Sequence, residues 1–325
     1  MKAITLVLAV VLVAAGCSSA TDTIGAQQDP TAVQPLPQGA KEVRELDPPS
    51  VDTSCGDPKA SFRPSGALPA PGAFPAGSKL AEISQRGRLV VGVDQNTYGF
   101  AFRDTDGEIK GFALDVARRI AEAIFGDPSK IQLTVLTSAQ RIPAVENGDV
   151  DLVVHSMTTN CERWEKVDFS SVFYEAQQRV LVRKGFGYTG LQSLADKKVC
   201  ATEGSTSLAR IVNEDITPKP IGVQVAGWTD CLVMMQQYQV DAISTDDTIL
   251  AGLAFQDPSV EMVGDSIASE PYAIAMPKSN EDFVRFVNAV LEKIKTDGSW
   301  QKSYNDWLLP LLKTSATPPT AIYRD

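Results

Sequence analysis

Apolar residues in the middle of the chain recur in two alternating patterns. Short continuous runs of Val, Ile and Leu predict strands buried inside a sheet, because such strands face apolar layers on both sides. Between the runs, apolar residues recur at the three- and four-residue spacing of amphipathic helices. The predicted strands cover 88–94, 131–136 and 150–155, and the predicted helices cover 80–86, 111–124 and 141–147. Strands that alternate with helices indicate parallel sheets in an α/β fold.

A second alternating set predicts another α/β lobe. Its strands are expected at 198–201 and 240–244, with a helix at 207–213 between them. Two amphipathic helices, at 281–295 and 299–309, end the pattern. With 325 residues and 43% apolar content, the chain is long enough to fold into two lobes.

The first residues have the pattern of a bacterial export signal. Lys2 precedes an apolar run that is too short to span a bilayer comfortably, and Ala14-Ala15-Gly16-Cys17 follows it, which resembles the lipobox of lipoproteins. We therefore expect a signal peptide at 1–16 and lipidation of Cys17, which would anchor the mature protein to the outside of the cell membrane. Ala14 stands where lipoboxes usually have Leu, so an uncleaved anchor or ordinary secretion stays open.

Residues 17–78 show no convincing apolar periodicity. This segment holds ten of the twenty prolines, together with many Ala, Gly, Ser and Asp residues. Such a composition is typical of a linker, and a flexible coil of this length would span roughly 45 Å. We expect it to be a tether that holds a globular head away from the membrane.

Four cysteines follow Cys17, an even number in a compartment that favours disulfides. Cys200 ends a predicted strand and Cys231 opens a helix of the same lobe, so we expect these two to pair. Cys55 would then join the N-terminal segment to Cys161. Sequence alone permits three pairings, and the spacing of Cys and His predicts no metal site.

Charge and composition narrow the class of function. The net charge of -10 opposes nonspecific attraction to nucleic acid or to anionic lipid. The chain has a single histidine, which leaves few groups for acid–base catalysis near neutral pH. An acidic protein with a local group of arginines is a better candidate for capturing a small charged solute.

Hydroxyl and arginine side chains crowd one edge of the first predicted sheet. Ser156, Thr158 and Arg163 follow the third predicted strand, where ligands of open α/β sheets bind. Ser138 and Arg141 begin the preceding helix, whose free backbone N–H groups also favour negative charge. The two segments together predict a site for a small anion.

A series of sequence blocks follows one another between residues 79 and 310. The blocks are LVVGVD (89–94), GFALDVARRIAEAI (111–124), RIPAVENGDVDLV (141–153), MTTNCER (157–163), VDFS (167–170), VLVRKG (180–185), EGSTS (203–207), VDAISTDD (240–247) and DGSWQKSYNDW (297–307). This ordered set resembles the polar-amino-acid-binding proteins of bacterial ABC importers, known as solute-binding family 3. The resemblance covers nearly the whole globular part of the chain.

The resemblance implies an α/β fold of the type II periplasmic-binding-protein class, in which two hinge crossover strands join two lobes. The expected boundaries are 79–173 plus 273–325 for a discontinuous lobe 1, 178–267 for lobe 2, and 173–177 and 268–272 for the hinges. Proteins of this family bind solutes without bond chemistry. The resemblance therefore implies no enzyme activity, no catalytic residue, no cofactor and no bound metal.

Within the family, the block MTTNCER is most similar to the glutamate/aspartate-binding branch. The likeness assigns Arg163 to the α-carboxylate of the ligand and Asp246 to its α-ammonium group. A buried zwitterion needs a fixed opposite charge at each pole, which these two side chains would supply. The further donors that the likeness assigns are Ser156 and Thr158 in lobe 1 and Thr202 and Ser205 in lobe 2.

Two features of the chain favour a ligand with a second carboxylate. Ser138 and Arg141 match the residues that read a side-chain carboxylate in the glutamate/aspartate branch. Many relatives also hold the ligand between two aromatic rings, whereas this chain has Thr97 and Ser138 at those positions. Tyr98, Phe100 and Trp228 are expected to supply packing against the ligand instead.

The resulting expectation is a monomeric extracytoplasmic lipoprotein that delivers L-glutamate or L-aspartate to an ABC permease. L-glutamine and L-asparagine stay open as ligands. A lipoprotein that presents amino-acid availability to a transmembrane sensor is an alternative, and a periplasmic dehydratase on the same fold is a remote one. Structural roles also stay open for Arg141 as an exposed residue, Asp246 and Ser138 as helix caps, Trp228 in a core, and Thr202 and Ser205 in turns.

Overall fold

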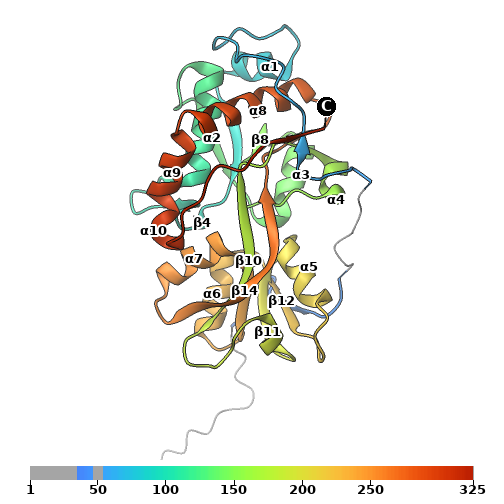
Figure 1. Cartoon of the computed structure of the whole chain (residues 1–325), viewed down its shortest axis with the longest axis vertical. Coiled ribbons are helices and arrows are strands. Elements are labelled where there is room, and N and C mark those ends of the chain that lie inside the picture. The colour runs from blue at the N-terminus through green and yellow to red at the C-terminus, as the bar shows by residue number, and fades with distance from the viewer. Residues whose placement is uncertain (1–34, 47–53, 325) are drawn as a thin grey trace, which may run out of the picture. The chain divides into compact units, whose positions relative to one another are not determined.

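A computed structural model of the chain describes residues 35–46 and 54–324, and Leu36–Asp325 forms one compact unit. Two β-sheets lie at the centres of two lobes within this unit (Figure 1). Lobe 1 contains the five-stranded sheet and lobe 2 contains the six-stranded sheet. The α/β fold with two lobes agrees with the fold expected from the sequence.

The sheet of lobe 1 is mainly parallel at one side and antiparallel at the other. Its strand order is β7 (Ile131–Val135), β3 (Leu89–Val93), β8 (Leu152–Val153), β15 (Ala275–Pro277) and β9 (Val167–Phe169). β3 pairs parallel with β7 and β8, while β15 pairs antiparallel with β8 and β9. The short strands β4 (Asn96–Thr97), β5 (Ala101–Arg103) and β6 (Ile109–Lys110) form a separate antiparallel sheet in this lobe.

Helices cover the sheet of lobe 1, and local residues set their ends. Ser78 caps α1 because its hydroxyl accepts a hydrogen bond from the Ala81 N–H at 3.1 Å. Gly126 ends α2 in the left-handed conformation, with φ of 72°, which glycine adopts without strain. The helices are α1 (Lys79–Arg86), α2 (Phe112–Phe125), α3 (Arg141–Glu146), α4 (Cys161–Lys166), α8 (Glu281–Thr296), α9 (Ser299–Trp307) and α10 (Leu309–Leu312), with the 3₁₀ helix η1 (Ser138–Gln140).

The sheet of lobe 2 has the strand order β1 (Lys41–Val43), β12 (Ile221–Val225), β11 (Lys198–Thr202), β13 (Ala242–Asp246), β10 (Tyr174–Arg183) and β14 (Val260–Tyr272). β11 pairs parallel with β12 and β13, so the carboxyl ends of these strands meet at one edge. A disulfide between Cys200 and Cys231 ties β11 to the helix beside it. The helical segments of this lobe are η2 (Leu191–Leu194), α5 (Thr206–Asn213), α6 (Trp228–Gln236) and α7 (Asp247–Gln256).

Two long antiparallel strands, β10 and β14, connect the lobes (Figure 1). Their pairing runs from Tyr174 opposite Tyr272 to Arg183 opposite Val260, with an irregularity between Gln178 and Val180. The expected hinge segments 173–177 and 268–272 fall at the ends of these strands that lie toward lobe 1.

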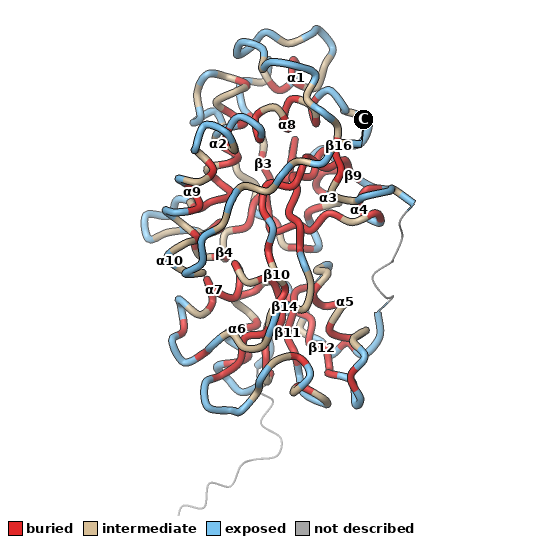
Figure 2. The backbone as a smooth tube through the Cα atoms, in the orientation of Figure 1, coloured by how far each residue is buried: buried red, intermediate tan, exposed pale blue. Residues whose placement is uncertain are grey.

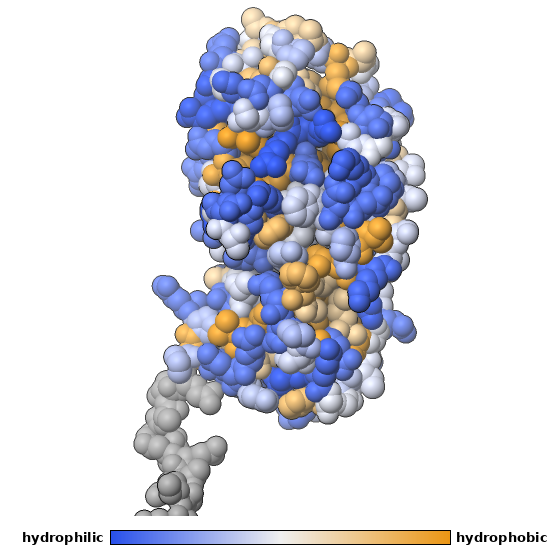
Figure 3. All heavy atoms as spheres, turned by 90° about the vertical axis from the view of Figure 1, so that its left-hand side faces the viewer, coloured by the Kyte–Doolittle hydropathy of each residue, from blue (hydrophilic) through white to orange (hydrophobic). Residues whose placement is uncertain are grey.

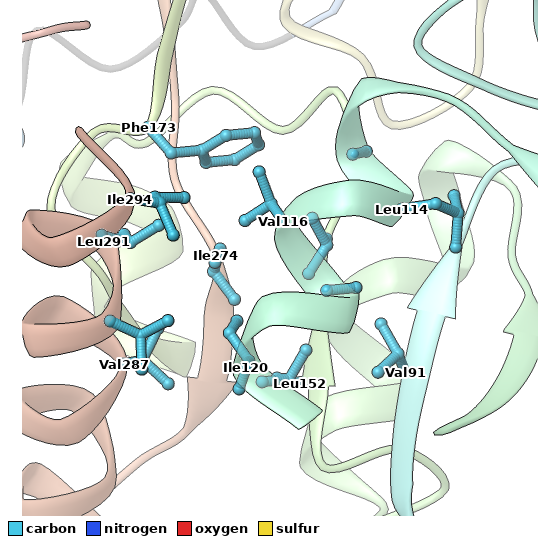
Figure 4. Close-up of a cluster of buried hydrophobic side chains, with 14 of the residues drawn as sticks. Val91, Leu114, Val116, Ile120, Leu152, Phe173, Ile274, Val287, Leu291 and Ile294 are labelled. Carbon is cyan, nitrogen blue, oxygen red and sulfur yellow. The ribbon is translucent and has the colours of Figure 1, made fainter. Parts of the chain in front are cut away.

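Each lobe has its own apolar core, and buried residues follow the central strands (Figure 2). In lobe 1, α2 lies at the middle of the core. Figure 4 shows Val116 and Ile120 of α2 between α8, which carries Val287 and Leu291, and the strand that carries Val91. Full burial of a side chain of this size contributes roughly 1.5–3 kcal/mol. Two separate cores allow each lobe to move as a body.

The expectation of a tether that extends to residue 78 is wrong for the part of it that the structure describes. β1 pairs antiparallel with β12 of lobe 2, and β2 (Ala60–Ser61) pairs parallel with β16 (Ile322–Tyr323). A disulfide joins Cys55 to Cys161, and the partly buried Phe62 packs against the core of lobe 1. Proline-rich composition concealed these contacts, because each relies on one to three residues and leaves no periodic pattern. The signal segment and Cys17 lie outside the described residues.

In the described part of the chain, no helix combines the length and the apolar character that are needed to cross a membrane. On the face shown in Figure 3, hydrophobic atoms appear as separate patches among hydrophilic ones.

Candidate ligand-binding site

Polar side chains from both lobes line a cavity of about 10 Å³. That volume has room for about one water molecule, so the lobes meet closely here. Lobe 1 contributes Ser138, Arg141, Ser156, Thr158 and Arg163, and lobe 2 contributes Ser205, Thr206, Ser207, Trp228, Thr245 and Asp246.

Helix ends position the two arginines. Arg141 is the first residue of α3, directly after η1, and Arg163 lies in the first turn of α4. The Asn160 side chain caps α4 by accepting a hydrogen bond from the Arg163 N–H at 2.9 Å. This cap fixes the turn from which the Arg163 side chain projects. Both arginine side chains are buried, with exposed fractions of 2% for Arg141 and 7% for Arg163.

The two guanidinium groups converge on one carbonyl oxygen of lobe 2. Arg141 donates from Nη2 and Arg163 from Nη2 to the Gly204 carbonyl, at 3.3 and 3.1 Å. Within lobe 1, Arg141 also donates to the carbonyls of Ser138 and Ser156 at 2.8 and 2.6 Å. Arg163 donates to the Thr158 carbonyl at 2.5 Å. These bonds hold the forks in place, and the shared carbonyl marks a position where both can meet an acceptor.

Electrostatics make this position attractive to an anion. Burial and the neighbouring Arg163 charge lower the pKa of Arg141 to about 9. Burial also lowers the pKa of Arg163. Both shifts mean that the charged guanidinium groups are poorly solvated, and a nearby negative charge relieves that cost.

The opposite charge lies on lobe 2. Asp246 ends β13, and its Oδ2 accepts a hydrogen bond from the Tyr272 hydroxyl at 2.5 Å. Among the described residues, neither Oδ1 of Asp246 nor Nε1 of Trp228 finds a hydrogen-bond partner, although both atoms are buried. Burial, with the charge of Glu270, raises the pKa of Asp246. A cation that donates hydrogen bonds would satisfy the free oxygen and stabilise the carboxylate.

Eight of the ten ligand-binding residues predicted from the sequence line this cavity, and two do not. Thr202 lies next to the wall, where its hydroxyl donates to the Ser138 hydroxyl at 3.2 Å. Tyr98 is elsewhere: its ring stacks on Phe255 of α7, with centroids 4.3 Å apart and planes 6° apart. Tyr98 therefore lies away from the cavity wall, and its packing against a ligand stays a prediction. Tyr98 follows the short strand β4, which lies against both α7 and α6.

Several hydroxyl groups on the wall are already committed. The Thr158 hydroxyl donates to a carboxylate oxygen of Glu270, so the donor that Thr158 can offer to an anion is its backbone N–H. Ser205 is the N-cap of α5, accepts from the Leu208 N–H at 3.2 Å and donates to the Thr202 carbonyl. Ser205 thus has the structural role that the sequence left open, and it also lines the cavity.

Of the other structural alternatives, the two helix-cap roles do not describe Asp246 and Ser138, whereas the place in a core does describe Trp228. Asp246 occupies the N-cap position of α7, but its side chain makes no capping hydrogen bond there. Thr137, rather than Ser138, is the N-cap of the helical turn that begins at Ser138. Trp228 lies against the core of lobe 2 and also reaches the cavity wall.

Sequence reasoning missed part of the wall and one residue behind it. Thr206 and Ser207 belong to the EGSTS block, and Thr245 precedes Asp246, so a wider reading of those blocks would have included them. Glu270 is fully buried behind the wall, yet nothing in its local sequence distinguishes it from an exposed strand residue.

Residues 89–310 match the bacterial extracellular solute-binding proteins, family 3. The chain belongs to this family. It is therefore a solute-binding protein and not an enzyme, in agreement with the sequence-based expectation. Within residues 35–46 and 54–324, no group of His, Cys, Asp or Glu side chains could hold a metal ion.

Individual relatives are named for amino acids. The ABC transporter glutamine-binding protein GlnH of Bacillus subtilis is 36% identical over 70% of this chain and 84% of its own length. The glutamate/aspartate import solute-binding protein of Escherichia coli is 28% identical over 71% of this chain and 80% of its own length. A solute receptor for L-cysteine from Neisseria gonorrhoeae has a similar structure, with a TM-score of 0.69 at 26% identity, covering 73% of this chain and 96% of that one.

Proposed function

We propose that this family member binds an acidic amino acid, L-glutamate or L-aspartate, between its lobes. The observation that carries the proposal is the charge of the cavity wall. Two guanidinium groups, of Arg141 and Arg163, face one carboxylate, of Asp246, which leaves one net positive charge. A dicarboxylic amino acid has two carboxylates and one ammonium group, so its net negative charge complements this wall.

The geometry also supports a definite orientation of the ligand. The α-carboxylate would contact Arg163, the α-ammonium group would satisfy Oδ1 of Asp246, and the second carboxylate would contact Arg141. Because an amino acid is much larger than the cavity of about 10 Å³, it requires the lobes to part before it enters. It would then compete with the Gly204 carbonyl for both arginines, with the advantage of a full charge.

Function in this proposal comes from closure. A ligand that contacts arginines of lobe 1 and an aspartate of lobe 2 stabilises the closed form, and a membrane partner recognises that form. L-glutamine is a second candidate ligand for this chain, because one relative is named for glutamine. Leaving the buried Arg141 without a carboxylate would cost about 1–3 kcal/mol, or roughly 5- to 150-fold in affinity.

Calorimetric titration with L-glutamate, L-aspartate, L-glutamine and L-asparagine tests the ligand. The wild type is expected to prefer the two acids, and Arg141→Ala is expected to lose that preference because its charge no longer selects the second carboxylate. Tighter binding of L-glutamine than of either acid by the wild type would overturn the assignment.

We further infer that Cys17 carries a lipid anchor and that the chain supplies an ABC permease. The lipobox-like Ala14-Ala15-Gly16-Cys17 and the family membership support this inference. A mature protein whose mass lacks a diacylglyceryl group would overturn the anchor. Uptake of radiolabelled ligand is expected to fall in a deletion strain, whereas unchanged uptake would count for presentation to a transmembrane sensor.

A further inference from the structure

Glu270 is a fully buried carboxylate that the proposed ligand contacts do not use. It lies on β14, one of the two strands that connect the lobes, and its exposed fraction is 0%. A buried carboxylate is costly unless hydrogen bonds and a counter-charge surround it. The residues that bind the Glu270 carboxylate therefore indicate its role in the structure.

Both lobes supply those partners. The Thr158 hydroxyl of lobe 1 and the Thr206 hydroxyl of lobe 2 donate to the same oxygen, Oε2, the latter at 2.9 Å. Arg210 of α5 donates to the other oxygen, Oε1, at 3.0 Å. One carboxylate thus joins a connecting strand, the end of lobe 1 that carries the cavity wall, and the first turns of α5 in lobe 2.

The network extends into the second connecting strand. Arg210 donates from Nε to the Gln178 side-chain oxygen on β10 at 2.8 Å. Gln178 is fully buried and donates from Nε2 to the Ser244 hydroxyl on β13 at 3.0 Å. Arg210 therefore fixes the position of α5 relative to both connecting strands.

We propose that Glu270 is a positioning residue that locks the two lobes together in the closed form, and this rests on the proposed binding function. Thr158 and Thr206 both line the cavity and belong to different lobes. A rotation that separates the lobes changes the distance between their hydroxyl groups, so Oε2 loses one of its two donors. Closure restores the pair and at the same time brings both threonines to the cavity wall.

Replacement of Glu270 tests the lock. Glu270→Gln keeps the size of the side chain but removes the charge that Arg210, Thr158 and Thr206 share, so the affinity for L-glutamate is expected to fall at least about tenfold, mainly through faster dissociation. Neither Glu270 nor Arg210 lines the cavity. Glu261→Gln, on an exposed position of the same strand, is the matched control and is expected to bind as the wild type does.

Variants of Thr206 distinguish a lock between the lobes from a general loss of structure. Thr206→Val is expected to weaken binding, Thr206→Ser to restore it, and the double variant Thr206→Val with Glu270→Gln to lose less than the sum of the two single losses. Wild-type affinity in Glu270→Gln, or additive losses in the double variant, would overturn the proposal even if unfolding studies show lower stability.

A measurement without ligand keeps this test independent of the proposed function. If the wild type binds none of the four amino acids, the proposed ligand fails while the lock is still testable. Small-angle X-ray scattering of the unliganded protein is expected to give a larger radius of gyration for Glu270→Gln than for Glu261→Gln. Identical scattering curves would overturn the lock.

Discussion

At the scale of single residues, the cavity wall carries buried charges that have few hydrogen-bond partners. Arg163 has its donors directed at the Thr158 and Gly204 carbonyls, and Asp246 has one oxygen without a partner among the described residues. Neutral carbonyls satisfy the geometry of a guanidinium group but not its charge. These buried charges support the proposed ligand, which carries charge at both ends.

Arg163→Ala is expected to abolish measurable binding of L-glutamate. Removal of one partner of a buried charge pair costs about 3–5 kcal/mol, because the other charge stays desolvated. Calorimetric titration checks the result, with Arg88→Ala, a substitution at an exposed position, as the control. Near-wild-type affinity in Arg163→Ala would remove Arg163 from the site.

His155 gives a second prediction, on stability against pH. The residue is buried, and burial lowers its pKa to about 4, below its usual 6.5. Between these values the unfolded chain binds a proton that the folded chain does not, so the contribution of His155 to stability is lost as pH falls from about 6.5 to 4. The full effect is on the order of 3 kcal/mol. His155→Asn is expected to show a smaller loss of unfolding free energy over this range in urea denaturation.

Asp247 is expected to change the pH dependence of stability in the opposite direction, which makes it a comparison for His155. Burial raises its pKa to about 6, so the folded chain binds the extra proton and stability falls as pH rises from about 3.8 to 6. Asp247→Asn is expected to be more stable than the wild type near pH 7 and to lose stability more steeply on acidification. An unchanged pH profile in both variants would contradict the burial of these groups.

The sequence blocks identified the charged residues that line the cavity, but local sequence did not place Tyr98 or Glu270. Arg141, Arg163 and Asp246 stand in blocks that the family likeness identifies, and each side chain has a charge that a buried site must use. Tyr98 could be placed near a strand end but not assigned to a face, because the short strand β4 has too few residues to show a period. Glu270 depends on partners 60 to 112 residues away in sequence, which no local pattern reveals.

At the scale of elements, α7 of lobe 2 lies so close to lobe 1 at Gly252 that a larger residue would not fit there. A Cβ atom on Gly252 would lie 2.8 Å from the Tyr98 carbonyl oxygen, a distance that requires the backbone to move. Beside it, the Tyr98 and Phe255 rings stack. Gly252 is therefore a contact point between the lobes that lies away from the ligand cavity.

Gly252→Ala is expected to weaken binding of L-glutamate at least about tenfold without lowering the stability of the unliganded protein. Alanine favours a helix over glycine by roughly 0.5–1 kcal/mol, so α7 itself gains, whereas the closed lobes would clash at Tyr98. Calorimetry and thermal unfolding of the unliganded variant measure the two effects separately. Gln256→Ala, at the exposed end of the same helix, is the control. Unchanged affinity would show that α7 does not touch lobe 1 in the bound form.

Elements with a strong period were predictable, and elements defined by distant pairing were not. The helices at 111–124 and 281–295 in the prediction are α2 and α8 in the structure, because their apolar stripes each face a core. The full length of β14 is not apparent from its sequence, since many of its residues are only partly buried. Strand β1 has three residues and exists through its partner β12.

At the scale of the whole molecule, the N-terminal segment and two disulfides join regions that are far apart in sequence. Cys55 and Cys161 are 106 residues apart, and Cys200 and Cys231 are 31 residues apart. A longer closed loop restricts the unfolded chain more, which makes the first bond the stronger stabiliser in the chain-entropy view.

Replacement of Cys55 and Cys161 by alanine is expected to lower the free energy of unfolding by about 4–5 kcal/mol. Replacement of Cys200 and Cys231 is expected to cost less, about 3–4 kcal/mol. Urea denaturation without reductant gives the comparison. The first pair is also expected to weaken ligand binding, because Cys161 begins the helix that carries Arg163. A reversed order of the two losses would contradict this account.

The place of β1 at the edge of the sheet in lobe 2 has a practical consequence for any shortened form of the protein. β1 is the outermost strand of this sheet and pairs with β12, so it covers the backbone N–H and C=O groups along the edge of β12. Without β1, these groups would be free to pair with another chain. A recombinant protein started at residue 79, the beginning of the recognisable globular sequence, would expose the edge of β12, remove the strand that pairs with β16 and leave Cys161 as a free thiol. Such a truncation invites self-association and mixed disulfides, so expression should begin upstream of Lys41.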